Sequence, residues 1–302
     1  QVDFYDVASK GATQPIKSLS VPLAGDVTAF AQSAPHQGSY AYMDSTGRLS
    51  VVKPFFSVSF PNNIRTLTPK LNWPIGETPL DILEDMDKVV QQFAFAKEEE
   101  SLGVLYFTND NQVEFVRFEG EEDMFTEAVV WTPYRSSLSF VSGKVLNLHV
   151  APDISRIFIV TEQNVYVANS RDGENVELLY TLNVNRKHKL TSSQLLAGAN
   201  SLVLGYADGY IGQWFETNSD QGRDFIQARH FMMQVESDNK GVAKIYPEFY
   251  RRTFAATTTD GQVNLFHTTS EAELWQGKLS DKRLHALSFS PRSNALVSLE
   301  SS

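Results

Sequence analysis

The sequence predicts an all-β protein, a β-propeller of six four-stranded blades. Two observations carry this prediction: a strand–turn–strand unit that repeats along the chain, and the pattern at its two ends. The composition adds a third, because 42% of the 302 residues are hydrophobic and 12% are aromatic. Chains of this size bury about three quarters of their unfolded surface. We therefore expect a folded body rather than a disordered segment.

The repeating unit consists of an apolar strand, a second strand, a sharp turn and a strand of alternating apolar and polar residues. Its clearest copy covers residues 242–246, 254–258 and 262–267, with Asp260-Gly261 at the turn. Asp-Gly between alternating runs predicts a hairpin, because both central residues of a type I′ turn need positive φ. Four further copies contain the turns Ser45-Thr46-Gly47, Asn109-Asp110-Asn111, Glu162-Gln163-Asn164 and Asp208-Gly209.

A fourth strand with an aromatic residue near its end follows most copies. These aromatic residues are Trp73, Trp131, Tyr180 and Trp275. Four strands per unit is the anatomy of a propeller blade, and equivalent positions predict packing between or around blades rather than a binding cage. We assign the remaining length to loops, chiefly residues 54–70, 76–88 and 218–223, with a short helical turn within 79–88.

The two ends of the chain predict how the ring closes. Residues 284–289 and 295–299 resemble the first two strands of a further unit, while residues 1–6 repeat the pattern of 262–267. We expect residues 1–23 and 284–302 to share the last blade, so that the N- and C-terminal strands pair and no sheet edge stays exposed. Residues 1–302 then form one domain. Seven blades is the alternative, because six blades of about 50 residues exceed the usual repeat of about 40 to 45.

Composition excludes several function classes. The chain has 26 Lys+Arg and 36 Asp+Glu, a formal net charge of 26 − 36 = −10, which argues against a nucleic-acid-binding module. The absence of cysteine excludes disulfides, thiolate catalysis and Cys-ligated zinc. No window approaches the roughly 18 apolar residues of a membrane-spanning helix. Because the chain starts at Gln1 without a signal-peptide pattern, we expect it to be a piece of a longer protein.

The motifs of common enzymes are missing. The six histidines are scattered over different repeats, and neither HExxH, GxSxG, GxxxxGK[ST] nor GxGxxG occurs. We therefore predict no catalytic, cofactor-binding or metal-binding residue, no cofactor, and a protein that is not an enzyme. Two groups resemble fragments of calcium loops without the complete spacing, and turn chemistry is the favoured explanation for both. They are Asn109-Asp110-Asn111 with Glu114, and Asp220 with Asp224.

A basic cluster stands out in this acidic chain and is the candidate binding site. It could face an acidic partner or anionic lipid, although an ordinary solvated loop is the favoured alternative. Arg251-Arg252 is a second, smaller cluster, and the acidic segments 98–100 and 119–123 are expected to be solvated loop tips or a docking surface for a basic partner. The residues of the main cluster are Arg186, Lys187, His188 and Lys189.

The repeats resemble WD40-type propellers in architecture, but the Gly-His and Trp-Asp signatures of that family are absent. A narrower similarity involves residues 260–274, 287–292 and Leu296. This segment resembles the large insert in long proteobacterial forms of the phosphate ABC transporter permease, where blocks like LYHATAE and LSPR recur between the first two membrane helices. The similarity covers the last sixth of the chain.

The resemblance implies a non-enzymatic interaction or regulatory domain on the periplasmic side of the bacterial inner membrane. Its partners would be other transporter subunits and the phosphate-binding protein, with membrane attachment only through flanking segments. Two alternatives stay open. One is a free-standing WD40-like scaffold protein, and the other is a propeller hydrolase or lyase with acidic and His residues at the mouth of the central channel.

Overall fold

The structure is a computed structural model of the chain. It describes residues 1–5, 14–21, 25–33, 38–85, 87–125, 129–196, 201–219, 222–235, 241–248, 252–281, 284–290 and 295–300. Within these ranges the regular secondary structure is β-strand, apart from one short 3-10 helix, η1 (Pro61–Asn63). The same ranges contain no helix with the length and hydropathy needed to cross a membrane.

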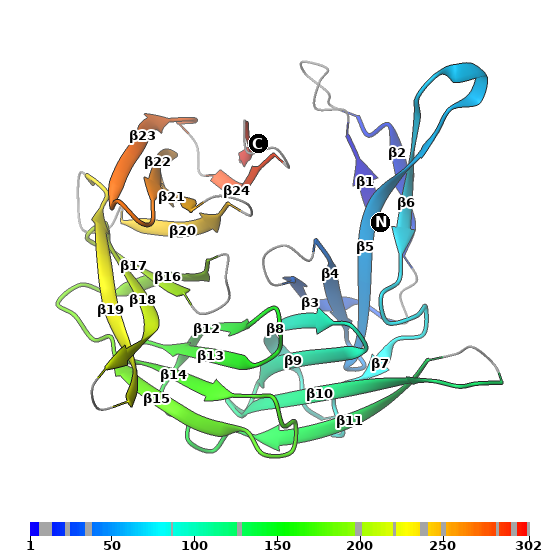
Figure 1. The fold of residues 1–302 in the computed structure, drawn as a ribbon, viewed down its shortest axis with the longest axis horizontal. Coiled ribbons are helices and arrows are strands. Elements are labelled where there is room, and N and C mark those ends of the chain that lie inside the picture. The colour runs from blue at the N-terminus through cyan, green and yellow to red at the C-terminus, as the bar shows by residue number, and fades with distance from the viewer. Residues whose placement is uncertain are drawn as a thin grey trace.

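Five antiparallel sheets of four or five strands form most of the molecule (Figure 1). The first has β3 (Val27–Gln32), β4 (Tyr40–Asp44), β5 (Arg48–Ser59), β6 (Thr66–Asn72) and β7 (Leu80–Asp81). The second has β8 (Val90–Glu98), β9 (Ser101–Thr108), β10 (Val113–Glu122) and β11 (Val129–Ser137). The third has β12 (Val145–Val150), β13 (Arg156–Thr161), β14 (Asn164–Asn169) and β15 (Glu177–Asn183).

The fourth sheet has β16 (Leu190–Leu195), β17 (Ser201–Tyr206), β18 (Tyr210–Ser219) and β19 (Gly222–Met232). The fifth has β20 (Val242–Pro247), β21 (Thr253–Thr258), β22 (Gln262–His267) and β23 (Ala272–Lys278). Two separate two-stranded sheets complete the described strands. They are β1 (Val2–Phe4) with β2 (Lys17–Leu19), and β24 (Leu284–Phe289) with β25 (Leu296–Glu300).

The sheets are arranged around a centre like the blades of a propeller. The first strands β3, β8, β12, β16 and β20 contact one another in sequence around that centre, and in the last four sheets the following strands step outward in chain order. The predicted all-β propeller is thus confirmed. The described residues form five complete blades, so the predicted count of six or seven is not confirmed.

The same β-bulge occurs in every pairing between a first and a second strand. In each case the register shifts one residue after the strand begins, which bends and twists the strand locally. The shift also occurs in the pair β24–β25, which therefore has the geometry of the first half of a blade. The shifts lie at Val27/Ala29, Val90/Gln92, Val145/Asn147, Leu190/Ser192, Val242/Lys244 and Leu284/Ala286.

The hydrophobic core is a series of layers between neighbouring blades. Met43 and Leu49 of the first blade pack with Phe93 and Phe95 of the second, and each later pair of blades has its own cluster. Complete burial of such side chains stabilises the fold by about 1.5–3 kcal/mol each. Each blade is therefore held chiefly by its neighbours, as in other repeat proteins.

No strand pairing among the described residues joins the two ends of the chain, so the shared last blade stays a prediction. Among the described residues β1 pairs only with β2, and β25 pairs only with β24. The ring of Phe4 lies 5.4 Å from that of Phe56 in β5, centroid to centroid, whereas Leu284 and Leu287 pack against the fifth blade. The two small sheets lie apart (Figure 1), and each contacts a different blade.

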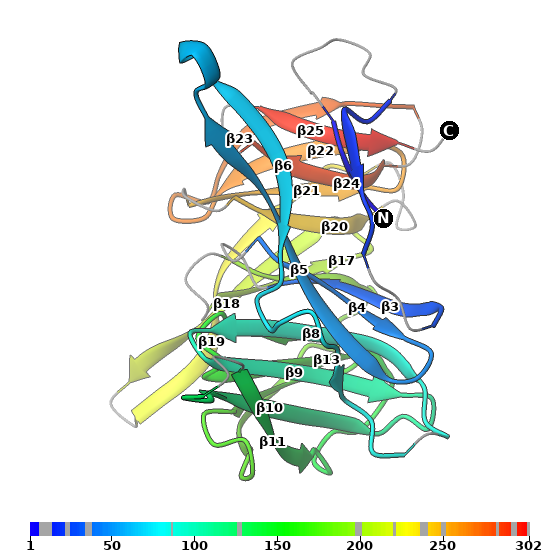
Figure 2. The ribbon, with the colours of Figure 1, turned by 90° about the vertical axis from the view of Figure 1, so that its right-hand side faces the viewer.

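The segment expected to be a loop at residues 54–70 is a long β-hairpin instead. β5 pairs with β4 in its first half, and its second half runs beyond the blade, where residues 53–59 pair with β6. β7 takes the outer place beside the first half of β5. The strand predicted around Trp73 thus belongs to the hairpin, and the described part of 79–88 contains β7 and no helical turn. Figure 2 shows the hairpin projecting from the ring.

Candidate interaction surfaces

A cavity of about 500 Å³ occupies the centre of the ring. The strands β3, β8, β12, β16, β20 and β24 line it, and its described wall contains no Asp or Glu. His149 and Lys244 are present there, but they belong to different blades. The hydrolase or lyase alternative predicts a cluster of His, Asp or Glu at this place, and the described wall does not have one.

Polar side chains of the channel wall connect consecutive blades. Gln92 Nε2 donates to Asn147 Oδ1 at 2.8 Å, and Asn147 Nδ2 donates to the Ser193 carbonyl at 3.2 Å. His149 Nε2 lies 2.8 Å from Ser193 Oγ. Burial lowers the pKa of His149 to about 4, because the interior disfavours the charged imidazolium. His149 is therefore a neutral part of the wall at physiological pH.

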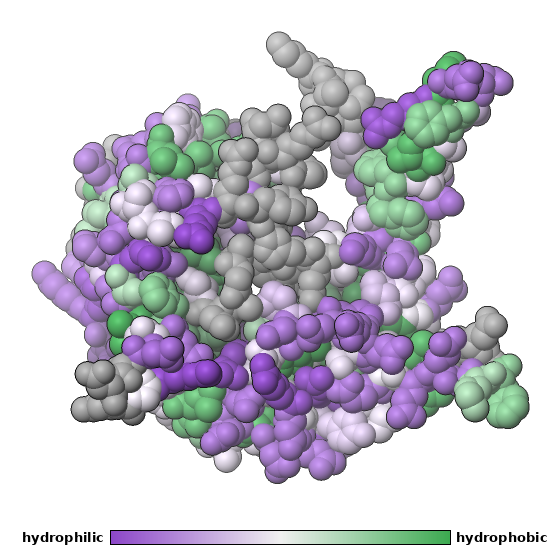
Figure 3. Space-filling model, viewed as in Figure 1, coloured by the Kyte–Doolittle hydropathy of each residue, from purple (hydrophilic) through white to green (hydrophobic). Residues whose placement is uncertain are grey.

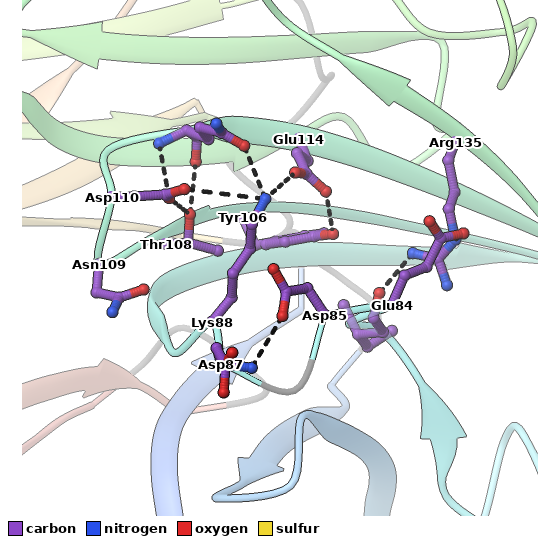
Figure 4. A network of polar contacts seen from close by, with 12 residues as sticks. Glu84, Asp85, Asp87, Lys88, Tyr106, Thr108, Asn109, Asp110, Glu114 and Arg135 are labelled. Atoms are coloured by element: carbon purple, nitrogen blue, oxygen red, sulfur yellow. Dashed lines mark hydrogen bonds and ion pairs between the residues drawn. The ribbon is translucent and has the colours of Figure 1, made fainter.

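The carboxylates that resemble a calcium loop surround a lysine (Figure 4). Lys88 Nζ lies 2.7 Å from Gln112 Oε1, 3.3 Å from Glu114 Oε1 and 3.9 Å from Asp110 Oδ2. The Tyr106 hydroxyl donates to the other Glu114 oxygen at 2.6 Å. Burial alone would lower the pKa of Lys88, but the hydrogen bond and the charge of Glu114 raise it above the usual value. The ammonium thus supplies the positive charge that a calcium ion would bring.

Turn chemistry explains the rest of this group. The Thr108 hydroxyl hydrogen-bonds to Asp110 and lowers the pKa of that carboxyl, and the backbone N–H of Gln112 adds a further bond. Asn111 adopts a positive φ of 61°, which Asn tolerates. The described residues contain no group of three or more His, Asp or Glu that could hold a metal. Of the second predicted group, Asp220 lies outside the described residues.

The predicted basic cluster lies at one end of the fourth blade, where its arginine stacks on tyrosine rings. The Arg186 guanidinium carbon is 3.6 Å from the centroid of Tyr210 and 5.2 Å from that of Tyr206. Lys187 and Lys189 are exposed, and neither forms an ion pair with another described residue. His188 is partly buried. The cluster is therefore a fixed arginine flanked by two exposed ammonium groups.

Two residues that the sequence analysis did not identify extend this surface. The Tyr210 and His230 rings stack with their centroids 6.0 Å apart and an 8° interplanar angle, and His230 Nδ1 lies 3.7 Å from Glu271 Oε2. We call Arg186, Lys187, Lys189, Tyr210 and His230 the Arg186 surface. Neighbouring strands of a blade run antiparallel, so the segment before β16 and the β17–β18 turn lie at the same end of the blade. This order of strands is a signal that could have identified Tyr210. The end of β19 lies at the same end of the blade, but the diagonal contact of Tyr210 with His230 depends on the exact register of β18 and β19.

The acidic segments have partners both at their base and farther out, where the Phe125 N–H donates to Asp123 Oδ1 at 2.8 Å. Glu119 forms an ion pair with Arg117 and accepts a hydrogen bond of 2.5 Å from Ser101 Oγ. Farther out, Met124 and Phe125 are 92% and 94% exposed. In the smaller basic cluster, Arg251 lies outside the described residues.

Two of the repeated aromatic residues pack between blades as predicted. Trp131 Nε1 donates to the Ile75 carbonyl at 3.1 Å, and the Tyr180 hydroxyl donates to Glu216 Oε1 at 3.0 Å. Trp131 also packs against the core between the first two blades. Trp275 is instead exposed on β23, the outer strand of the fifth blade.

The comparisons with solved structures show that the chain has a WD40-like β-propeller fold. No protein-family model matches the chain, and no curated protein sequence is significantly similar to it. The fold is therefore recognised by its geometry and not by its sequence, which agrees with the missing Gly-His and Trp-Asp signatures.

Among solved structures, the chain is similar to Sqt1 of Chaetomium thermophilum bound to the N-terminus of ribosomal protein L10. The TM-score is 0.55 at 16% identity, over 94% of this chain and 72% of that one. Hsv2 of Kluyvelomyces marxianus gives a TM-score of 0.51 at 10% identity, over 92% and 70%. Raptor of Chaetomium thermophilum gives 0.54 at 9% identity, over 87% of this chain and 22% of that one. Nothing in these comparisons supports the predicted phosphate transporter domain.

Proposed function

We propose that this chain is a non-catalytic scaffold module that binds an acidic segment of a partner protein on the Arg186 surface. The observation that carries the proposal is the stacking of Arg186 on Tyr210, with Lys187 and Lys189 exposed beside it. Aromatic residues and arginine are enriched in protein interfaces, and tyrosine offers a large contact area with little loss of conformational freedom.

Charge favours an acidic partner. The surface carries three cations on a chain of net charge −10, so a local positive field would orient an acidic segment toward it. Support for a protein partner comes from the neighbour Sqt1, which is bound to the N-terminus of a ribosomal protein. The Glu271 carboxylate beside His230 forms the acidic border of the surface.

Charge reversal tests the proposal. In the host cell, the affinity-tagged protein should recover a partner that cross-links to the Arg186 surface. The double variant Lys187→Glu/Lys189→Glu should lose that partner. The matched control Lys144→Glu/Arg171→Glu reverses two exposed charges elsewhere on the ring and should retain it. Equal recovery by both variants would remove this surface as the docking site.

The shape of the ring is also part of the proposal. We propose that β24–β25 and β1–β2 are the two halves of a sixth blade, which closes the ring when β25 pairs with β1. The repeated bulge in β24–β25 supports the first half. The similarity between residues 1–6 and 262–267 supports β1 as a third strand. Closure would satisfy the backbone groups of two exposed edges.

A transporter domain on the periplasmic side of the bacterial inner membrane is a second candidate function. It rests on the sequence resemblance of residues 260–274 and 287–292 alone. The described part of these residues includes β22, the start of β23 and the end of β24. The complete reading frame tests it. Membrane helices on both sides of this domain would support it, whereas their absence would leave the free-standing scaffold.

A further inference from the structure

The projecting β5–β6 hairpin differs in charge from the rest of the molecule. Between Leu49 and Gly76 the only charged residues are Lys53, Arg65 and Lys70. This segment is therefore a basic arm on an acidic protein. Its seven paired residues, 53–59, extend it by about 23 Å at roughly 3.3 Å per residue.

The two faces of the hairpin have different chemistry. The register places Phe55 opposite Lys70 and Ser57 opposite Thr68 on one face. The other face is apolar, because side chains alternate along a strand. This face carries Pro54, Phe56 and Val58 of β5 and Leu67, Pro69 and Leu71 of β6.

β1 covers only the base of the apolar face, where Phe4 packs on Phe56. Beyond that contact Val58 and Leu67 are 49% and 47% exposed. Exposure rises to 63% at Phe60 and 67% at Ile64, at the end of the hairpin. Figure 3 shows hydrophobic side chains along the projecting arm and at its end. The outer half of the apolar face thus has no covering element in the described structure.

The end of the hairpin holds these side chains in a defined turn. The Asn63 N–H donates to the Phe60 carbonyl at 3.2 Å, and the Ile64 N–H donates to the Pro61 carbonyl at 3.0 Å. Asn62 and Asn63 adopt positive φ values of 52° and 62°, which Asn tolerates better than other non-glycine residues. Phe60 and Ile64 are therefore presented together, with Arg65 directly beside them.

We propose that the outer half of the β5–β6 hairpin inserts into the surface of an anionic lipid membrane. Apolar side chains at its end would enter the boundary between headgroups and acyl chains, while Arg65 and Lys70 would meet anionic headgroups. A membrane suits this surface because the apolar residues lie on a protruding arm with cations and no carboxylate. An apolar protein groove would not require that charge.

Vesicle binding tests the proposal. The protein should co-sediment with phosphatidylcholine vesicles that contain about 30% phosphatidylserine, and less with phosphatidylcholine alone or at high salt. Phe60→Asp/Ile64→Asp should weaken this binding by about tenfold or more. The matched control is Met124→Asp/Phe125→Asp, which changes a second exposed apolar tip, next to Glu121, Glu122 and Asp123, and should leave binding unchanged. Far-UV circular dichroism checks that both variants fold.

A second measurement locates the contact. Brominated lipids should quench the fluorescence of a Phe60→Trp variant when anionic vesicles bind, more than they quench the unmodified protein. Failure of the unmodified protein to bind anionic vesicles, equal loss of binding in the two double variants, or absence of this additional quenching would each overturn the membrane contact. Retained vesicle binding with loss of a protein partner in the Phe60→Asp/Ile64→Asp variant would assign the hairpin to a protein instead.

Discussion

Lys88 shows how one side chain changes the interpretation of its neighbours. The carboxylates of Asp110 and Glu114 suggest a cation site when they are viewed along the sequence, but Lys88 precedes β8 and reaches them across the blade. A charged hydrogen bond of this kind is stronger than a neutral one. The positive charge therefore comes from within the chain.

Replacement of Lys88 by Met should lower the melting temperature, because Glu114 loses its cation while it still accepts the Tyr106 hydroxyl. Differential scanning calorimetry measures the effect. Glu114→Gln in the Lys88→Met background should recover part of the loss, since the carboxylate is then neutral. Additive effects of the two changes would contradict this coupling.

His149 makes the stability of the fold depend on pH. Its pKa is about 4 in the folded protein and about 6.5 when unfolded, so the unfolded chain binds the proton more tightly. The contribution of neutral His149 to the free energy of unfolding is complete above pH 6.5 and is lost as the pH falls toward 4. The shift corresponds to about 3 kcal/mol of unfolding free energy.

Chemical unfolding at a series of pH values checks this prediction. His149→Gln removes the titration and retains a donor for Ser193, so the free energy of unfolding should fall less between pH 6.5 and 4 than in the unmodified protein. An identical pH dependence in the two proteins would assign the loss to other groups.

At the scale of elements, the blades pack closely where small residues allow it. A Cβ atom added to Gly205 of β17 would lie 2.5 Å from Val242 Cγ1 of β20, and one added to Gly103 of β9 would lie 2.5 Å from Ile154 Cγ2. Both glycines lie in the second strand of a blade and face the following blade. The absence of a side chain therefore lets the inner strands approach each other.

Gly205→Ala should destabilise the protein by about 1–3 kcal/mol, because overpacking moves the fourth and fifth blades apart. Urea unfolding measures the loss. Val242→Ala in the same chain should restore part of it by making room for the new methyl group. No loss in the single variant would mean that the interface can relax at little cost.

At the scale of the whole molecule, closure of the ring depends on one strand pairing. In the fifth blade Ala256 pairs with Ile245 on one side and with Asn264 on the other. In the proposed sixth blade Ser298 takes the place of Ala256, because it pairs with Leu287. Asp3 takes the place of Asn264, because residues 1–6 repeat the pattern of 262–267. Opposed residues of antiparallel strands lie about 4.5–5.5 Å apart at Cα, within reach of a disulfide.

Asp3→Cys/Ser298→Cys should therefore form an intramolecular disulfide on oxidation, detected as altered mobility in non-reducing electrophoresis. The chain has no cysteine of its own, so the bond has no competitor. Ser18→Cys/Ser298→Cys is the control, because Ser18 lies one strand farther out and should not cross-link. If neither pair reacts, the sixth blade is not closed in solution.

The sequence by itself determined most of the blade strands, the turns between them and the all-β propeller class. These features depend on contacts between near neighbours, such as Asp260-Gly261 between alternating runs. Only the tertiary structure decided that β5 leaves its blade to form a hairpin, that Arg186 stacks on Tyr210, and that Phe4 packs on Phe56. Each of these outcomes is a contact or a strand pairing between segments that are distant in the sequence. Local periodicity predicts which face of a strand is apolar, but it does not predict which distant residues that face will contact.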